Sequence, residues 1–473
     1  MIPGHALSNS DIWRAQQLFD GLYTLGPDAK PVPALAESAE PNADGTVWTI
    51  KVRSGVTWHD GKPLTAEDVV ASIKTWTGKD NYYAGNLAKL LDTDGVRVRG
   101  PLTVEVPFKV PVADFAGVSA FYPYLITRPD IYKKGAQLIG TGPFKYQSFT
   151  PGKRAVVVAN KDYWGVSGGP YVEQQIVDSS FTDDTARVNA LLSGSIDIAP
   201  AMPPALAKAN ASSQRIYLGH APGTATYYFQ CRVDQAPFKD LRVMHALKML
   251  CDREAMIQTV FSGYATQSND LTGPGLPYFA GADVFPVRKY DPEQAKSLLK
   301  QAGQENLSLT LYTSSVSPGL VEGATAYAQQ AAKGGVKIKV SRVSPSLYYT
   351  AQGPAGGYMS YPFFAEFPGG GSSVPSLTSV YLTNIWTKGG SNETHFGNAQ
   401  TDKLLLDAIG ELDQSKAQEK WNAIQKAQYD GGGSVTYGAA EYVDGYTRRV
   451  RGVETNRAGW VNNFNVSKAW ITT

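Results

Sequence analysis

The side chains that could carry out chemistry are few in this sequence, and their spacing matches no catalytic pattern. Its five histidines are His5, His59, His220, His245 and His395, and none belongs to an H-E-x-x-H motif or a tight metal-binding cluster. The chain has no phosphate-binding P-loop. The run 369–372, Gly-Gly-Gly-Ser, lacks the lysine and helix context of a phosphate loop, which favours a plain flexible loop. We therefore expect no enzymatic activity, no cofactor and no metal site.

The composition limits the classes of protein to consider. At 473 residues the chain exceeds a single core, so two or three domains are expected. A net charge of +2 and a pI near 8.2 argue against a nucleic-acid binder. The sequence contains no stretch of 18 apolar residues, and no segment has the pattern of a signal peptide, so we expect neither a membrane span nor a signal segment in it. Aromatic residues reach 11%, which suits either a ligand-contacting surface or ordinary packing.

One stretch, residues 46–73, predicts the elements around which the chain is organised. Trp48, Ile50 and Val52 alternate with polar residues and predict a half-buried strand. Turns follow at Ser54-Gly55 and Asp60-Gly61. Thr65 is then a suitable N-cap, with Asp68 three residues later, and the apolar residues beyond it recur at helical spacing. His59 is interpreted as a turn residue.

The sequence pattern of this stretch resembles a signature of the solute-binding proteins of ABC importers, in the oligopeptide/dipeptide-binding family (family 5). The pattern is R-x-G-V-x-W-H-D-G-x-P-L-T-A-E-D-V-V-x-S. Further matches follow in the family's order: IGTGPFKY at residues 139–146, LLSGSIDIA at 191–199, and the pattern PF-x-D-x-R-V-x-x-A-L…D-R-E-A from residue 237. The resemblance covers almost the whole chain.

The resemblance implies an α/β protein with the two-lobed periplasmic-binding-protein fold (class II-like, with a hinge of two crossovers) and an extra small α/β domain. The first lobe would comprise residues 1–26, 139–232 and 438–473. The inserted small domain would occupy residues 27–138, and the second lobe residues 233–437.

The resemblance also implies where a ligand binds. Peptide-binding members enclose an extended ligand between the lobes, where it adds as a strand and places its side chains in hydrated pockets. Carried over by position, the ligand-binding residues are Asp20, Leu22, Tyr23, Tyr228, Gln230, Phe363, Phe364, Glu366, Trp386, Ser391, Asn392, Glu393 and His395.

Two departures from the family pattern bear on the ligand. Pro362 stands where peptide binders commonly have glycine, and proline cannot donate an N–H to a ligand strand. Phe367-Pro368-Gly369 replaces the usual second acid-Pro pair. Both departures favour a ligand other than an ordinary peptide.

Three functions remain open on the sequence. The first is an extracytoplasmic binding subunit, periplasmic or lipid-anchored and monomeric, that delivers a peptide or peptide-like solute to the membrane permease of an ABC importer. The second is a binding-protein fold recruited to a biosynthetic enzyme role. The third is an importer subunit for a non-peptide ligand, such as a glycoside or a metal chelate.

Two expectations concern single residues. Cys231 on the crossover strand and Cys251 at the end of the helix that packs on it are expected to form a disulfide, with two buried free thiols as the alternative. Glu366 stands where the family's peptide binders have an aspartate that pairs with the ligand's α-amino group. We therefore expect a ligand with a positive group anchored at Glu366, against the alternative that Glu366 pairs with a lysine or arginine of its own chain.

Overall fold

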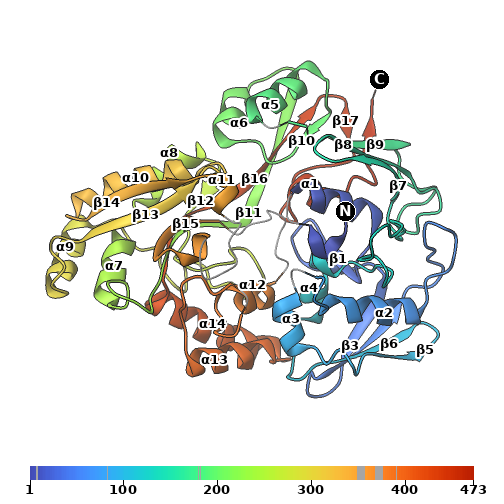
Figure 1. Cartoon of the computed structure of the whole chain (residues 1–473), viewed down its shortest axis with the longest axis horizontal. Coiled ribbons are helices and arrows are strands. Elements are labelled where there is room, and N and C mark those ends of the chain that lie inside the picture. The colour runs from blue at the N-terminus through green and yellow to red at the C-terminus, as the bar shows by residue number, and fades with distance from the viewer. Residues whose placement is uncertain are drawn as a thin grey trace.

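The computed structural model describes residues 1–6, 9–81, 84–178, 180–181, 183–348, 357–367, 376–389 and 391–472. The chain forms two α/β lobes, as predicted. In Figure 1 one lobe gathers around β13, β14 and α10, the other around α1, β1 and β7, and the long strands β11 and β16 run between them. Among the described residues, no helix is both long enough and apolar enough to cross a membrane.

The largest sheet has the order β10-β16-β11-β15-β13-β14, with the short strand β12 beside β16. Its strands are β10 (Ile198–Ala199), β11 (Ile216–Cys231), β12 (Ala265–Thr266), β13 (Ser308–Ser314), β14 (Lys337–Val343), β15 (Phe363–Glu366) and β16 (Ser434–Thr447). β11 and β16 pair antiparallel along almost their whole length, with register shifts between Ala221 and Ala225 and between Tyr227 and Tyr228. These two strands are the predicted crossovers.

Helices cover one face of this sheet in the second lobe. They are α7 (Leu241–Met249), α8 (Arg253–Phe261), α9 (Pro292–Gln301) and α10 (Leu320–Lys333). Asp240, Asp252 and Asp291 cap the first three, each accepting a hydrogen bond from a first-turn backbone N–H. The core beneath them is aromatic, with Phe229 stacked between Tyr327 and Tyr437.

The inserted segment folds around the stretch that the sequence singled out. Its sheet has the order β3-β4-β6-β5, and its elements are β3 (Ala36–Pro41), β4 (Val47–Val52), α2 (Ala66–Trp76), α3 (Ala84–Leu90), β5 (Arg97–Gly100), β6 (Thr103–Pro107) and α4 (Phe115–Ser119). In β4, Trp48, Ile50 and Val52 are buried, as their alternation predicted. Thr65 and Asp68 form a reciprocal capping box at the start of α2.

The family signatures contact one another. The backbone N–H of His59 donates to the carbonyl of Gly140 at 2.8 Å, and its ring bonds the backbone of Gly140 and Gly142 at 3.2 and 3.0 Å. Burial lowers the pKa of His59 to about 4, which keeps the ring neutral. Arg128 donates to both oxygens of the neighbouring Asp60 at 2.9 Å. The first signature therefore joins the inserted segment to the first lobe.

The first lobe contains a three-stranded sheet and the two chain ends. Its elements are α1 (Asn9–Leu18), β1 (Tyr23–Leu25), β7 (Phe144–Thr150), β8 (Arg154–Ala159), β9 (Gln174–Asp178), α5 (Asp184–Ser193), α6 (Pro204–Asn210), β17 (Val450–Arg451), α15 (Val461–Phe464) and β18 (Trp470–Ile471). Strand β2 (Pro31–Pro33), from the inserted segment, pairs with β1. Trp13 stacks on Phe464, which fixes the N-terminal helix against the C-terminal segment.

The inserted segment and the second lobe share one apolar core. It includes Ile73 of α2 together with Tyr381 of α12 (Leu377–Asn384) and Trp421 of α14 (Gln414–Gly431). Figure 1 shows α12 beside α3 and α4, and α13 (Ala399–Ile409) beside α14. The N–H of Ala113 donates to the carbonyl of Ile409 at 2.8 Å. Asp114 accepts hydrogen bonds from Ser376 and Thr378, so this contact is polar as well as apolar.

The predicted disulfide is wrong. Cys231 and Cys251 are both free thiols buried in the core of the second lobe. The thiol of Cys251 instead donates to the carbonyl of Thr436 at 3.9 Å. Burial raises the pKa of Cys251 to about 12 and that of Cys231 higher still, so both behave as small apolar side chains.

Candidate ligand-binding site

The central sheet of the second lobe has one apolar and one polar face. Strand alternation sends Phe229 and Cys231 of β11, and Phe363 and Ala365 of β15, into the core under α7 to α10. The intervening residues therefore lie on the opposite side. We call this the polar face, and it comprises Tyr228, Gln230, Phe364, Glu366, Ser434 and Thr436.

Strand register brings these six residues together. Tyr228 lies opposite Glu366 on one side and Thr436 on the other. Two residues along, Gln230 lies opposite Phe364 and Ser434. The structure thus assembles four of the residues predicted from sequence, namely Tyr228, Gln230, Phe364 and Glu366, into one patch across three strands.

Glu393 is held over this patch by neutral donors. The Gln230 side-chain amide donates to Glu393 at 2.9 Å, and the hydroxyl of Ser434 donates to the Gln230 carbonyl oxygen at 2.6 Å. The hydroxyl of Tyr358 donates a second hydrogen bond to Glu393. Only 8% of Glu393 is exposed, and this burial raises the pKa of its carboxyl to about 7.

Aromatic rings surround the two acids. The ring of Tyr358 meets Phe364 edge-on at 5.3 Å and lies 5.8 Å from Tyr348. Burial, together with the negative charges of Glu366 and Glu393, raises the pKa of Tyr228, Tyr348 and Tyr358 well above 10. Glu366 is 3% exposed. The patch therefore combines two buried carboxyl groups with four aromatic side chains.

Asp20 was predicted to bind ligand, but its carboxylate has other partners. It accepts hydrogen bonds from Thr141 at 2.9 Å, Tyr163 at 3.1 Å and Trp164 at 2.9 Å. Its backbone carbonyl accepts from Ile126 at 2.8 Å. The role that this geometry supports is to join the end of α1 to the rest of the first lobe.

Several other predicted residues are packed away from the polar face. Leu22 and Tyr23 lie in the core around the inserted segment, and Phe363 lies in the core of the second lobe, because alternation turns it away from Phe364. Trp386 is also a core residue, with the ammonium of Lys89 5.3 Å from its ring centroid.

The loop before α13 contributes one residue to the site, Glu393. Asn392 instead donates to the carbonyls of Ile385 and Phe396, and the N–H of Ser391 donates to the carbonyl of Thr383. His395 is partly exposed and lies 3.7 Å from Asp234. The carbonyl of Pro362 accepts from the N–H of Arg232. The run 369–372 and Pro368 lie outside the described residues.

Sequence reasoning missed Tyr348, Tyr358, Ser434 and Thr436. Ser434 and Thr436 alternate with the core residues Val435 and Tyr437, and this period-two pattern was a usable signal for a two-faced strand. The two tyrosines come from a short helix, α11 (Pro345–Tyr348), and the 3-10 turn Tyr358–Ser360, and no sequence pattern gives their position over β15.

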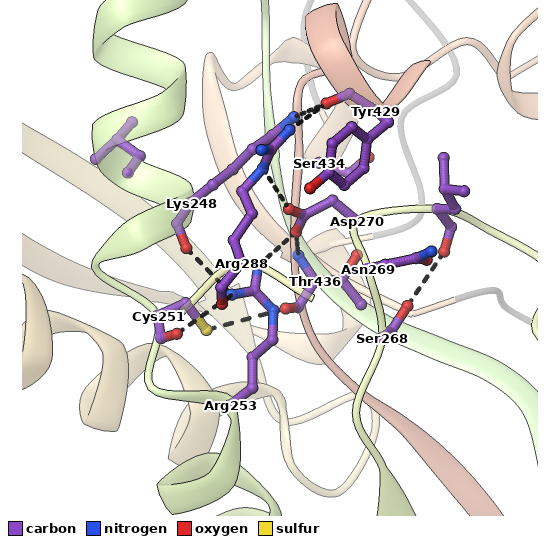
Figure 2. Close-up of polar contacts among 12 residues, drawn as sticks. Lys248, Cys251, Arg253, Ser268, Asn269, Asp270, Arg288, Tyr429, Ser434 and Thr436 are labelled. Atoms are coloured by element: carbon purple, nitrogen blue, oxygen red, sulfur yellow. Dashed lines mark hydrogen bonds and ion pairs between the residues drawn. The ribbon is translucent and has the colours of Figure 1, made fainter. Parts of the chain in front are cut away.

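Another buried carboxylate, Asp270, lies beside β16, and it also escaped prediction. Asp270 accepts from the N–H of Thr436 at 3.0 Å and from Arg253 at 2.6 Å, and it lies 3.2 Å from Arg288 (Figure 2). The ammonium of Lys248 and the guanidinium of Arg288 both donate to the carbonyl of Tyr429. The cations lower the pKa of Asp270 below its usual value despite complete burial. This cluster therefore supplies its own counter-charges.

The described residues hold no group of three or more histidine, cysteine, aspartate or glutamate side chains that could bind a metal ion. The polar face of the sheet, by contrast, gathers buried carboxyl groups and aromatic side chains. Residues 30–383 match the model of the bacterial extracellular solute-binding proteins, family 5 (middle). The chain belongs to this family, which confirms the resemblance; its members are the solute-binding subunits of ABC importers.

Relatives and solved structures agree with this assignment. The glutathione-binding protein GsiB of Salmonella typhimurium is 27% identical over 426 residues, covering 88% of this chain and 81% of that protein. The periplasmic binding protein AgaA of A. tumefaciens R10, solved with agropinic acid, has a TM-score of 0.82 at 22% identity, over 98% of this chain and 95% of that one. DppA of Helicobacter pylori, solved with the peptide STSA, has a TM-score of 0.81 at 18% identity, over 100% and 96%. These relatives are extracytoplasmic binding proteins.

Proposed function

We propose that this chain captures a peptide or peptide-like solute with a positive group and passes it to the membrane permease of an ABC importer. One observation carries the proposal: two buried carboxyl groups, Glu366 and Glu393, lie among four aromatic side chains on the polar face. The glutathione and peptide bound by GsiB and DppA support a peptide-like ligand. The chain would act as a monomer, free or lipid-anchored, and without turnover of its ligand.

The reason for a positive group is electrostatic. A carboxylate enclosed by protein is unfavourable unless a cation or several hydrogen bonds compensate it. Glu393 has two neutral donors, and its raised pKa reports incomplete compensation. An ammonium or guanidinium group bound there would stabilise the charged form of the acid.

The residues of the polar face take separate roles in this proposal. Glu366 anchors the ligand's ammonium group, and Tyr228 and Phe364 provide walls for an organic cation through cation–π contact. Ser434 orients the amide of Gln230, and that amide orients Glu393. Tyr348 donates its hydroxyl to the carbonyl of Ala365 at 2.6 Å and so holds the strand that carries Glu366.

The domain division predicted from sequence is part of the same proposal. Residues 1–26, 139–232 and 438–473 would move as one lobe, with 27–138 as the inserted domain, against residues 233–437. In this division the chain would cross between the lobes just after β11 and within β16. Ligand would bind at this junction and favour the closed arrangement of the lobes.

The test begins with a native mass spectrum of freshly purified protein, which identifies a co-purified ligand. Calorimetry of that ligand then compares wild type with Glu366→Gln and with Glu419→Gln, an exposed isosteric control on α14. We expect Glu366→Gln to weaken binding at least a hundredfold, because removing one partner of a buried charge pair costs about 3–5 kcal/mol. Affinity unchanged in a folded Glu366→Gln protein would remove the anchor role, and a ligand without a positive group would refute the proposed ligand class. Appearance of a cleaved product during the titration would refute the absence of turnover.

A further inference from the structure

Two acidic side chains lie at the polar face rather than one, Glu366 on β15 and Glu393 from the loop before α13. Glu366 lies opposite Tyr228, while Glu393 is bound to Gln230, which is two residues further along β11. Side chains two residues apart on one face of a strand are separated by about 7 Å. In an extended lysine or arginine residue, the distance from the α-amino group to the side-chain cation is similar to this spacing along the strand.

Glu393 is arranged to receive a cation. Its two hydrogen bonds come from neutral groups, Gln230 and Tyr358. The amide of Gln230 is held in one orientation, because its oxygen already accepts from Ser434. A carboxylate with two fixed neutral donors retains free lone pairs for a third, charged donor.

The surroundings of Glu393 favour an organic cation over a metal ion. The rings of Tyr228, Tyr358 and Phe364 surround the two acids, and aromatic faces attract ammonium and guanidinium groups. Among the described residues, Glu366 and Glu393 act electrostatically on the neutral side chains of Tyr228, Tyr348 and Tyr358. Across the described ranges there is no third acid, histidine or cysteine to complete a metal site with them.

We infer that Glu393 forms a second cation-binding position beside Glu366, so that the ligand carries a free amino group and a basic side chain on the same residue. This inference rests on the proposed function and narrows it. The ligand class is then a short peptide that begins with lysine or arginine, or a peptide-like compound with the same two positive groups.

Four defined peptides test the second position. Lys-Ala and Arg-Ala carry both cations, norleucyl-alanine lacks the side-chain cation, and N-acetyl-Lys-Ala lacks the amino group. Calorimetry measures each with wild type, Glu393→Gln, Glu366→Gln and the exposed control Glu419→Gln. Circular dichroism melting of each variant confirms that it is folded.

In wild type and the control, we expect at least one basic peptide to bind tenfold or more tightly than norleucyl-alanine. Glu393→Gln should abolish this ratio while leaving norleucyl-alanine unchanged. Glu366→Gln should weaken norleucyl-alanine and the basic peptides together. Binding of the basic peptide at pH 7 should also release protons, seen as a buffer-dependent enthalpy, and Glu393→Gln should lose this release.

The outcomes separate this inference from the proposed function. If norleucyl-alanine binds as tightly as the basic peptides and Glu366→Gln still weakens it, the second position is refuted and the anchor at Glu366 stands. A preference for basic peptides that survives in Glu393→Gln also refutes the assignment. If none of the four peptides binds, the inference falls, and the mass spectrum of the co-purified ligand still decides the proposed function.

Discussion

Asp270 and Glu393 are both buried carboxyl groups in the second lobe, yet their surroundings drive their pKa values in opposite directions. Asp270 has the guanidinium groups of Arg253 and Arg288 beside it, with Lys248 nearby, and its pKa is lowered. Glu393 is bound by the neutral side chains of Gln230 and Tyr358, and its pKa is raised to about 7. Equal burial therefore has opposite consequences for charge.

The difference indicates how this fold separates stability from binding. At Asp270 the protein supplies the counter-charges itself, so the carboxylate helps to fix the edge of β16 through the N–H of Thr436. At Glu393 the protein supplies two neutral donors, and in the proposed function the positive charge would come from the ligand. A variant of the first acid should therefore alter folding, and a variant of the second should alter binding and pH response.

The largest effect is expected from Asp270→Asn. Removing this carboxylate leaves Arg253 and Arg288 buried without a counter-ion, which costs about 3–5 kcal/mol. Urea unfolding at pH 7 measures the loss. The control is Asp430→Asn, which removes an exposed pair with Lys426 and should change stability by less than about 0.5 kcal/mol. A loss below about 1 kcal/mol for Asp270→Asn would mean that Asp270 is not needed to compensate the buried charges of Arg253, Arg288 and Lys248.

An intermediate loss of stability is expected from Asp20→Asn. The family resemblance had assigned this residue to the ligand site. The oxygen that accepts from Thr141 and Trp164 is replaced or turned away, so stability should fall by about 1–3 kcal/mol. Thr141→Val removes one donor and should cost less. Ligand affinity of the folded protein should stay within twofold. A tenfold loss of affinity at unchanged stability would instead show that Asp20 binds the ligand, as first predicted.

A smaller effect is expected from Glu393→Gln in the ligand-free protein, and it depends on pH. The folded pKa of Glu393 is about 7, above its ordinary value of 4.5, so the folded chain binds more protons than the unfolded chain between these values. Its contribution to stability is therefore present at low pH and is lost as the pH rises towards 7. Between pH 5 and pH 8, wild type should lose on the order of 1–2 kcal/mol more than Glu393→Gln in urea unfolding. Parallel losses would show that Glu393 is not the titrating group.

The smallest effect is expected from reductant. Because Cys231 and Cys251 are free, the melting temperature should not change when dithiothreitol is added. A thiol reagent should find two groups in denaturant without reductant and almost none in the folded protein, since burial raises both pKa values. If no thiol reacts in denaturant without reductant, the two cysteines form the disulfide that was first predicted.

Local sequence patterns predicted the elements well, because their causes are local. The capping box of Thr65 and Asp68 and the alternation in β4 each depend on residues within a few positions of one another. The family signatures were also readable, and they encode structure: His59 and Asp60 hold the inserted segment through Gly140, Gly142 and Arg128.

The site was predicted only in part, because its chemistry depends on partners distant in sequence. Alternation could have separated Phe364 from Phe363, but no local pattern reveals that Asp20 meets Thr141, Tyr163 and Trp164. Burial of Glu393 likewise depends on Gln230, more than a hundred positions earlier. Whether the two cysteines are free or disulfide-bonded could not be predicted for the same reason, because it depends on how they pack in the core.

The long pair β11 and β16 has a mechanical consequence. Tyr228, Gln230, Ser434 and Thr436 lie on the same two strands that connect the lobes, and the register shift between Tyr227 and Tyr228 falls beside them. In the proposed function, a ligand bound there would touch the pivot of lobe closure, where a small change in strand twist would displace the distant ends of both lobes by a much larger distance. The outer surfaces of the lobes, far from any ligand atom, would then report occupancy to a membrane partner.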